Sequence, residues 1–191
     1  MANLVRLTIG VAGPGACAAR WTHGGTRMNA AQWVKMLDLA PHPEGGYFRR
    51  TSTSGRTFRR DDGATRPLMT AIYYLLTADR PLGKLHRNQS DIIHFFHSGD
   101  PIVYWLLFPD GRLERHLLGP DPLVGHRLQL TVPGGIWKAS VLEAGDHGLI
   151  SEAVAPGFDP VDREMADAGL IERLFPAHWP QLSYLVGRGG S

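Results

Sequence analysis

The chain has 191 residues, of which 43% are hydrophobic and 20% are charged, and its formal net charge is +2 with neutral histidines. This length and composition are typical of a soluble globular protein with a single buried core. Lysines and arginines are scattered, and no uncharged apolar run approaches the roughly 18 residues of a membrane helix, so neither nucleic acid nor a membrane is expected as a partner.

The first 28 residues are expected to be a disordered extension in front of one domain over residues 29–187. The alternative is a secretory signal, because an early arginine precedes a short apolar run, but Gly13, Pro14 and Gly15 interrupt that run. Cys17 is the only cysteine of the chain, which excludes an intramolecular disulfide and a multi-cysteine zinc site. A cytoplasmic location is therefore expected.

The segment after Asn29 predicts an amphipathic helix over Ala30–Asp38. Asn29 can cap its N-terminus. The helix is expected to end near Leu39, because Pro41 and Pro43 disfavour helical geometry at the residues before them. Apolar side chains recur at the i, i+3, i+4 and i+7 spacing of one helix face in Ala30, Trp33, Val34 and Leu37.

From Tyr47 to Ala153 the sequence predicts antiparallel β-structure. Turn signals such as Pro109–Gly111 (PDG) and Val132–Gly135 (VPGG) separate short runs rich in β-forming residues. Many short strands without intervening helices indicate a sandwich or barrel. One or two short helices are expected in Asp159–Pro180 and should pack on the outside. The runs read LMTAIYYLLT, KLHR, DIIHFFH, PIVYWLLF, RLERHLL, HRLQLTV, IWKASVL and GLISEAV.

The stretch Leu85–Gly99, LHRNQSDIIHFFHSG, carries three histidines. Since residues two apart in a strand share a face, His94 and His97 should point to opposite faces and not bind one metal together. His86 can meet His94 if two strands pair, because cross-strand neighbours lie about 5 Å apart. Three interpretations stay open for this pair: a metal site, which needs a third ligand, an acid–base site, or hydrogen-bonded strand residues beside a wet cavity.

Several blocks of sequence, in order, resemble the DUF985 (Cupin_5) group of the cupin superfamily: HPEGGYFRRT, TAIYYLLT, HRNQSDIIHFFHSGDP, WLLFPDGRL, VPGGIWKAS and VAPGFDPVD. The resemblance covers roughly Trp33–Leu185. It implies an all-β fold, namely an RmlC-like double-stranded β-helix (jelly-roll barrel) with a short N-terminal helix and a C-terminal helical segment. It also implies a homodimer with a ligand cavity inside each barrel. It implies a fold rather than a reaction.

The chain departs from the metal-binding pattern of general cupins. His86 occupies the position of the first-motif histidine, but Ile92 stands where many members of the group have a glutamate. Trp137 and Lys138 stand where the second motif supplies a histidine. His94, on the face that the family uses for its glutamate, is the available substitute. No cofactor is therefore expected, and a divalent metal held by His86 and His94 is the disfavoured alternative.

The block PEGGYFR offers further candidates for a polar cavity lining. Glu44 is a candidate acid or base, Tyr47 a stacking or hydrogen-bonding residue, and Arg49 the contact for an anionic group. The alternative is that Gly45 and Gly46 only turn the chain and that Arg49 is paired on the surface.

Three more residues are candidate ligand contacts. Tyr73 contacts the ligand or belongs to the core, while Trp137 and Lys138, beside the VPGG turn, either cap the cavity or lie outside it. A lysine in a half-buried barrel mouth suits an anion.

These residues predict a barrel that binds a small polar or anionic metabolite, such as a sugar or a keto acid. If the protein is an enzyme, we expect a metal-independent isomerase or epimerase in which His86 or His94 removes a proton beside a carbonyl and Glu44 or a tyrosine returns it. The alternatives are a non-catalytic ligand-binding or sensor protein and a metal-dependent oxygenase. A second copy of the chain is the expected protein partner, because exposed edge strands need to be covered.

Overall fold

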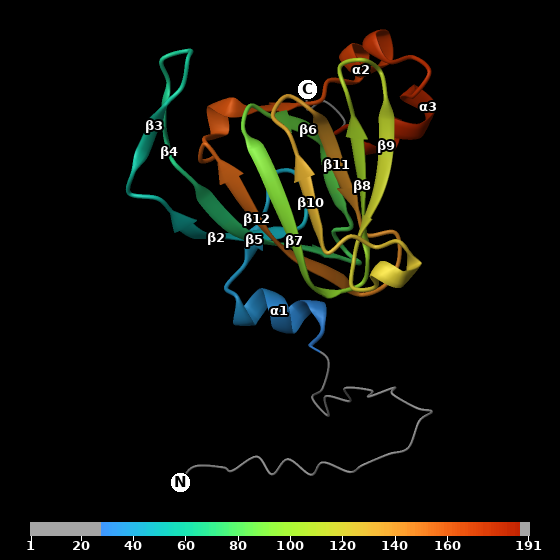
Figure 1. Cartoon of the computed structure of the whole chain (residues 1–191). Helices are drawn as coiled ribbons and strands as arrows, with labels where there is room; N and C mark the ends of the chain where they lie inside the picture. Colours follow the sequence, from blue (N-terminus) through green and yellow to red (C-terminus); the bar gives the residue numbers. More distant parts are fainter. Residues whose placement is uncertain (1–27, 188–191) are drawn as a thin grey trace, which may run out of the picture.

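Two antiparallel sheets face each other and enclose a barrel, from which one hairpin projects (Figure 1). The computed structural model describes residues 28–187. The predicted N-terminal extension and its signal-sequence alternative therefore lie outside the described residues, except for Met28. The expectation of an all-β jelly-roll barrel is confirmed. No helix within residues 28–187 has the length and apolarity to span a lipid bilayer.

Thirteen strands build the described part of the chain. They are Ala40–Pro41 (β1), Tyr47–Thr53 (β2), Thr57–Arg59 (β3), Thr65–Pro67 (β4), Thr70–Thr77 (β5), Leu82–Asn88 (β6), Asp91–Gly99 (β7), Ile102–Leu107 (β8), Leu113–Leu118 (β9), Gln129–Val132 (β10), Trp137–Val141 (β11), His147–Ala155 (β12) and Arg163–Met165 (β13). The larger sheet has the order β1-β2-β5-β12-β7-β10 and the smaller one the order β13-β6-β11-β8-β9. The projecting hairpin consists of β3 and β4.

Helical segments lie at the two ends of the domain. They are α1 (Ala30–Met36), α2 (Ala168–Leu174) and α3 (Trp179–Leu182), with 3₁₀ turns η1 (Pro122–Val124), η2 (Pro160–Asp162) and η3 (Ser183–Leu185). A capping box starts α1, since Asn29 and Gln32 each accept a hydrogen bond from the other's backbone N–H. The helix ends two residues before the predicted Asp38, because Asp38 has a φ of +52° in the left-handed region.

Apolar side chains form three packed layers rather than one. The first fills the barrel between the sheets, the second joins the smaller sheet to the C-terminal helices, and the third joins the larger sheet to α1. In β5, Tyr74 and Leu76 point into the barrel and Leu75 points to α1, and all three are buried. Both faces of this strand are covered, and burying one leucine contributes about 1.5–3 kcal/mol.

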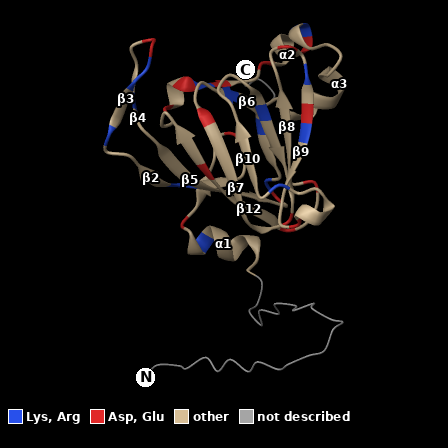
Figure 2. Cartoon of the chain, viewed as in Figure 1, with Lys and Arg blue, Asp and Glu red and all other residues tan. Residues whose placement is uncertain are grey.

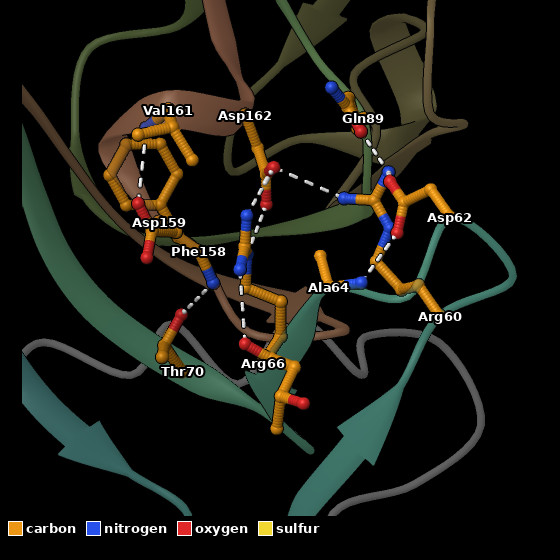
Figure 3. Close-up of polar contacts among 11 residues, drawn as sticks. Arg60, Asp62, Ala64, Arg66, Thr70, Gln89, Phe158, Asp159, Val161 and Asp162 are labelled. Atoms are coloured by element: carbon orange, nitrogen blue, oxygen red, sulfur yellow. Dashed lines mark hydrogen bonds and ion pairs between the residues drawn. The ribbon is translucent and has the colours of Figure 1, made fainter.

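Asp162 of η2 anchors the β3–β4 hairpin through Arg66 of β4 and Arg60 of the turn between the two strands (Figure 3). Arg66 donates from Nε to Oδ2 at 2.7 Å and from Nη2 to Oδ1 at 2.8 Å, and the Nη1 atom of Arg60 lies 3.1 Å from Oδ1. These hydrogen bonds, above all those from Arg66, lower the pKa of the buried Asp162 carboxyl. Basic and acidic residues both occur on this hairpin and are scattered over the rest of the ribbon (Figure 2).

Candidate active site

A cavity of about 50 Å³, which opens to solvent, lies between the two sheets. The larger sheet contributes β2, β5, β7 and β12, and the smaller sheet contributes β6 and β11. The turn between β1 and β2 and the loop before η2 complete the wall. The lining residues are His42, Glu44, Phe48, Arg50, Thr70, Ile72, Tyr74, His86, Asn88, Ile92, Lys138, Glu152, Val154 and Phe158.

Strand register places four side chains on one inward row of the larger sheet, namely those of Arg50, Ile72, Glu152 and His94. Arg50 pairs with Ile72, Ile72 with Glu152, and Glu152 with His94. In the smaller sheet Lys138 pairs with His86. Because side chains alternate between faces in a strand, these two sets meet inside the barrel. Strand pairing therefore brings together residues from six strands.

His86 and Glu44 form the closest polar pair in the cavity wall. The Nδ1 atom of His86 lies 2.7 Å from the carbonyl oxygen of Lys84, which can only accept, so Nδ1 carries a proton. The Nε2 atom lies 3.1 Å from Glu44 Oε2. A neutral Nε2 and a carboxylate oxygen each offer only a lone pair, and this contact therefore requires one proton shared by the pair.

Burial opposes a positive charge on His86. It lowers the pKa of His86 to about 3, and the charge of Lys138 lowers it further, while the Lys84 carbonyl and Glu152 act in the opposite direction. His86 is therefore a neutral imidazole at physiological pH. Its Nε2 lone pair faces the carboxyl group of Glu44, whose other oxygen is 3.1 Å from Arg163 Nη1.

The turn that carries Glu44 is fixed by backbone contacts. Gly45 has a φ of +118°, and a Cβ atom there would lie 1.8 Å from the carbonyl oxygen of Leu82. The backbone N–H of Lys84 donates to the Glu44 carbonyl at 2.9 Å, and the hydroxyl of Tyr74 donates to the Gly45 carbonyl at 3.0 Å. The turn is therefore bonded to the strand that holds His86.

Glu152 is the carboxylate on the opposite wall. Burial would raise its pKa, but the charge of Lys138 and the contact with His94 hold the pKa well below the usual range. The Nδ1 atom of His94 lies 3.3 Å from Glu152 Oε1 and 3.2 Å from the hydroxyl of Tyr104. Burial lowers the pKa of His94, so a neutral imidazole donates from Nδ1 to an ionised Glu152.

Lys138 and Tyr74 complete the polar part of the cavity. Lys138 is only 5% exposed, and its side-chain Nζ atom forms no hydrogen bond or ion pair with another residue in 28–187. Its charge acts on His86 and Glu152 through the cavity. Burial, together with the charges of Glu44 and Glu152, raises the pKa of Tyr74 well above its usual value, so Tyr74 is a neutral phenol and a proton donor.

Three predicted ligand contacts lie on the outer face of the larger sheet instead. Tyr47 packs beside α1 and donates to Asp79 at 3.2 Å, Tyr73 packs on the same layer, and Arg49 is exposed. The expected inward parity of Tyr47 and Arg49 was wrong by one residue, and Tyr73 belongs to a packed apolar layer, the alternative left open for it. The inward positions belong to Phe48, Arg50, Ile72 and Tyr74.

Of the other predicted site residues, some line the cavity and some lie elsewhere in the fold. Glu44, His86 and Lys138 line the cavity. Trp137 faces the C-terminal helices, where the guanidinium of Arg87 lies 4.6 Å from its ring centroid. His94 lies inside the barrel but does not line the cavity, and it acts on it only through Glu152.

The sequence analysis missed Glu152, Arg50 and His42. Glu152 is the one acidic residue in the predicted run GLISEAV, and its inward parity could have marked it. His42 accepts the backbone N–H of Glu44 at Nδ1 (3.2 Å), and burial lowers the pKa of its imidazole. His42 lies in an irregular turn, where no helix or strand periodicity predicts the direction of a side chain.

The donor set does not fit the divalent metal of general cupins. Within residues 28–187, no group of three histidine, cysteine or acidic side chains has the arrangement to hold a metal ion. The two carboxylates of the cavity are engaged by cations, Glu44 by Arg163 and Glu152 by the charge of Lys138.

Comparison with known proteins agrees with this fold. Residues 31–166 match the family model described as Cupin superfamily (DUF985). An uncharacterised protein of Saccharomyces cerevisiae, YML079W, is 42% identical over 142 residues, covering 67% of this chain and 70% of that protein. A hypothetical protein from Leishmania major superposes with a TM-score of 0.80 at 31% identity, covering 84% of this chain and 100% of that one. Protein SO0799 from Shewanella oneidensis gives 0.78 at 29%, covering 85% and 99%. The chain belongs to the DUF985 (Cupin_5) family of the cupin superfamily.

Proposed function

We propose that the barrel binds a small anionic metabolite with a carbonyl group and that the His86–Glu44 pair moves a proton at the carbon beside that carbonyl. This is the chemistry of a metal-independent isomerase or epimerase. The observation that carries the proposal is Lys138, a buried ammonium group without a direct partner among the described residues, in the same cavity as a pair that requires one shared proton.

The charges of the cavity support an anionic ligand. Lys138 is separated from its nearest opposite charge, since no ion pair joins it to Glu152. A buried cation without a direct counter-ion is costly, and a bound carboxylate or phosphate would satisfy it. Arg50 adds a second positive charge at the rim.

In the proposed reaction, Lys138 stabilises the oxygen on which negative charge develops. The His86–Glu44 pair, in its deprotonated form, accepts the proton of the adjacent carbon, and the electrons of that C–H bond form an enolate. Return of a proton to the opposite face of the same carbon gives an epimer. Where that carbon bears a hydroxyl group, return of the proton to the former carbonyl carbon gives an isomer, because the hydroxyl proton passes to the enolate oxygen and the hydroxyl becomes the new carbonyl. Tyr74, a neutral phenol in the same cavity, is the proposed returning acid. Atoms and charge balance without a co-reactant.

Exchange of solvent deuterium tests this function. The protein is incubated in D₂O with a panel of 2-keto acids and keto-sugar acids, and loss of the α-proton signal is followed by NMR. We expect wild-type protein to exchange at least one panel member, and His86→Asn to reduce the rate about 100-fold or more, the upper range for one general base. His97→Asn is the matched control, because His97 lies on the outer face and contacts Ser151 there at 2.9 Å.

Each outcome decides between the alternatives. Binding without exchange would overturn the proton transfer and leave a ligand-binding or sensor protein. Equal loss of exchange in both variants would overturn the role of His86. Failure to bind any anion of the panel would overturn the proposal as a whole.

We also propose that a second copy of the chain covers the outer face of the larger sheet. α1 covers only one part of this face, around Leu75 and Leu149. Ile93 and Phe95 of β7 stay half-exposed beside it, and Phe58 on the hairpin is 43% exposed. Apolar surface of this kind supports association between subunits.

A further inference from the structure

Arg50 has an unusual setting among the arginines near the cavity. Arg60 and Arg66 are paired with Asp162, and Arg163 is paired with Glu44. The guanidinium group of Arg50 lines the cavity, yet it makes no ion pair or hydrogen bond with another residue in the range 28–187. Its guanidinium lies 5.8 Å from the ring centroid of Phe158, another residue of the cavity wall. Its charge is therefore free to meet a ligand.

Strand register explains why the cavity carboxylate does not pair with Arg50. Arg50 and Glu152 stand on the same inward row, separated by Ile72. Two strand spacings separate their backbones by roughly 10 Å. Glu152 is engaged on its far side by His94 and by the charge of Lys138. The cavity thus has two cations on opposite sheets, Lys138 on the smaller sheet and Arg50 on the larger one.

We propose that Arg50 determines specificity by binding a second acidic group, so that the ligand is a short linear acid with an anionic group at each end. The inner anionic group lies toward Lys138, and the carbon chain passes the apolar side chains of Phe48 and Ile72. This inference rests on the proposed anion-binding function.

Arginine suits the outer group because its planar guanidinium binds carboxylate or phosphate in a bidentate manner. Arg50 is exposed at the cavity wall, where a ligand can reach its guanidinium group. The test distinguishes a carboxylate from a phosphate as the outer group by using two separate sets of compounds. One arm uses succinate, glutarate and adipate, and the other uses 3-phosphoglycerate.

The matched variants are Arg50→Gln and Arg49→Gln. The two arginines are adjacent in β2 and carry the same charge, but Arg49 points to the outer face. Binding of each diacid, and of the monocarboxylate of equal chain length, is measured by isothermal titration calorimetry at low salt. We expect wild type and Arg49→Gln to bind the best dianion at least tenfold more tightly than its monoanion. Arg50→Gln should lose this ratio and keep the affinity for the monoanion.

Failure of this inference is distinguishable from failure of the proposed function. If the monoanion binds as tightly as every dianion, or if the two arginine variants weaken dianion binding equally, Arg50 is not the specificity residue. In that case monoanion binding that is lost in Lys138→Met still supports the anion-binding cavity. If wild type binds no member of either arm and no monocarboxylate, the anion-binding function and the inference fall together.

Discussion

Replacing His86 by Asn should make the stability of the protein less sensitive to acid. Burial lowers the pKa of His86 from 6.5 to about 3 in the folded chain. Between these values the unfolded chain binds a proton that the folded chain excludes, so acid favours unfolding. The contribution of neutral His86 to the free energy of unfolding is complete above about pH 6.5 and is lost as the pH falls toward 3. At pH 4, wild type should have lost about 3 kcal/mol through this residue.

Urea unfolding followed by tryptophan fluorescence measures this difference at pH 7.5 and at pH 4. The Asn variant will be less stable at both pH values, since it loses the contact with Glu44. The informative quantity is therefore the change with pH within each protein. We expect the free energy of unfolding to fall more in wild type by about 3 kcal/mol. Equal falls would show that the folded protein already holds the shared proton on His86 and would refute the assignment of a neutral imidazole.

Three further predictions concern the carboxylates and the assembly. Glu152→Gln should destabilise the protein by about 1.5–3 kcal/mol, because it weakens a charged hydrogen bond from His94, and thermal unfolding with no change in midpoint would contradict this. Asp162→Asn should release the β3–β4 hairpin, so that its amide hydrogens exchange faster while those of β5 keep their protection; a uniform change over both would show that the hairpin is not anchored at this residue. Light scattering should give twice the chain mass of 21.0 kDa, and Phe95→Glu should shift it to the monomer value, whereas a wild-type monomer at micromolar concentration would rule out the proposed homodimer.

Secondary structure could be predicted because short-range chemistry determines it. Asn29 caps α1 as its side chain predicts, and the turns at Pro109–Gly111 and Val132–Gly135 separate strands as expected. The end of this helix was predicted less accurately than its start. Asp38 adopts a left-handed conformation that the sequence does not require of an aspartate, and the helix therefore ends early.

The candidate site was only partly predictable, because strand parity in β2 is ambiguous. Tyr47 and Arg49 on one face mirror Phe48 and Arg50 on the other, so each face offers an aromatic ring and a guanidinium. Only the packing of α1 against the outer face distinguishes the two sets. The pairing of Glu44 with His86 depends on a turn docking on a distant strand, which no sequence period reports.

The tight packing of Gly45 against Leu82 has a consequence for binding kinetics. Because backbone atoms hold this turn against β6, Glu44 and His86 are already assembled before any ligand arrives. Ordering a loop residue costs about 1–2 kcal/mol of conformational entropy, and here that cost falls on folding rather than on association. Ligand capture at this end of the barrel should therefore be limited by entry through the mouth and not by closure of a loop.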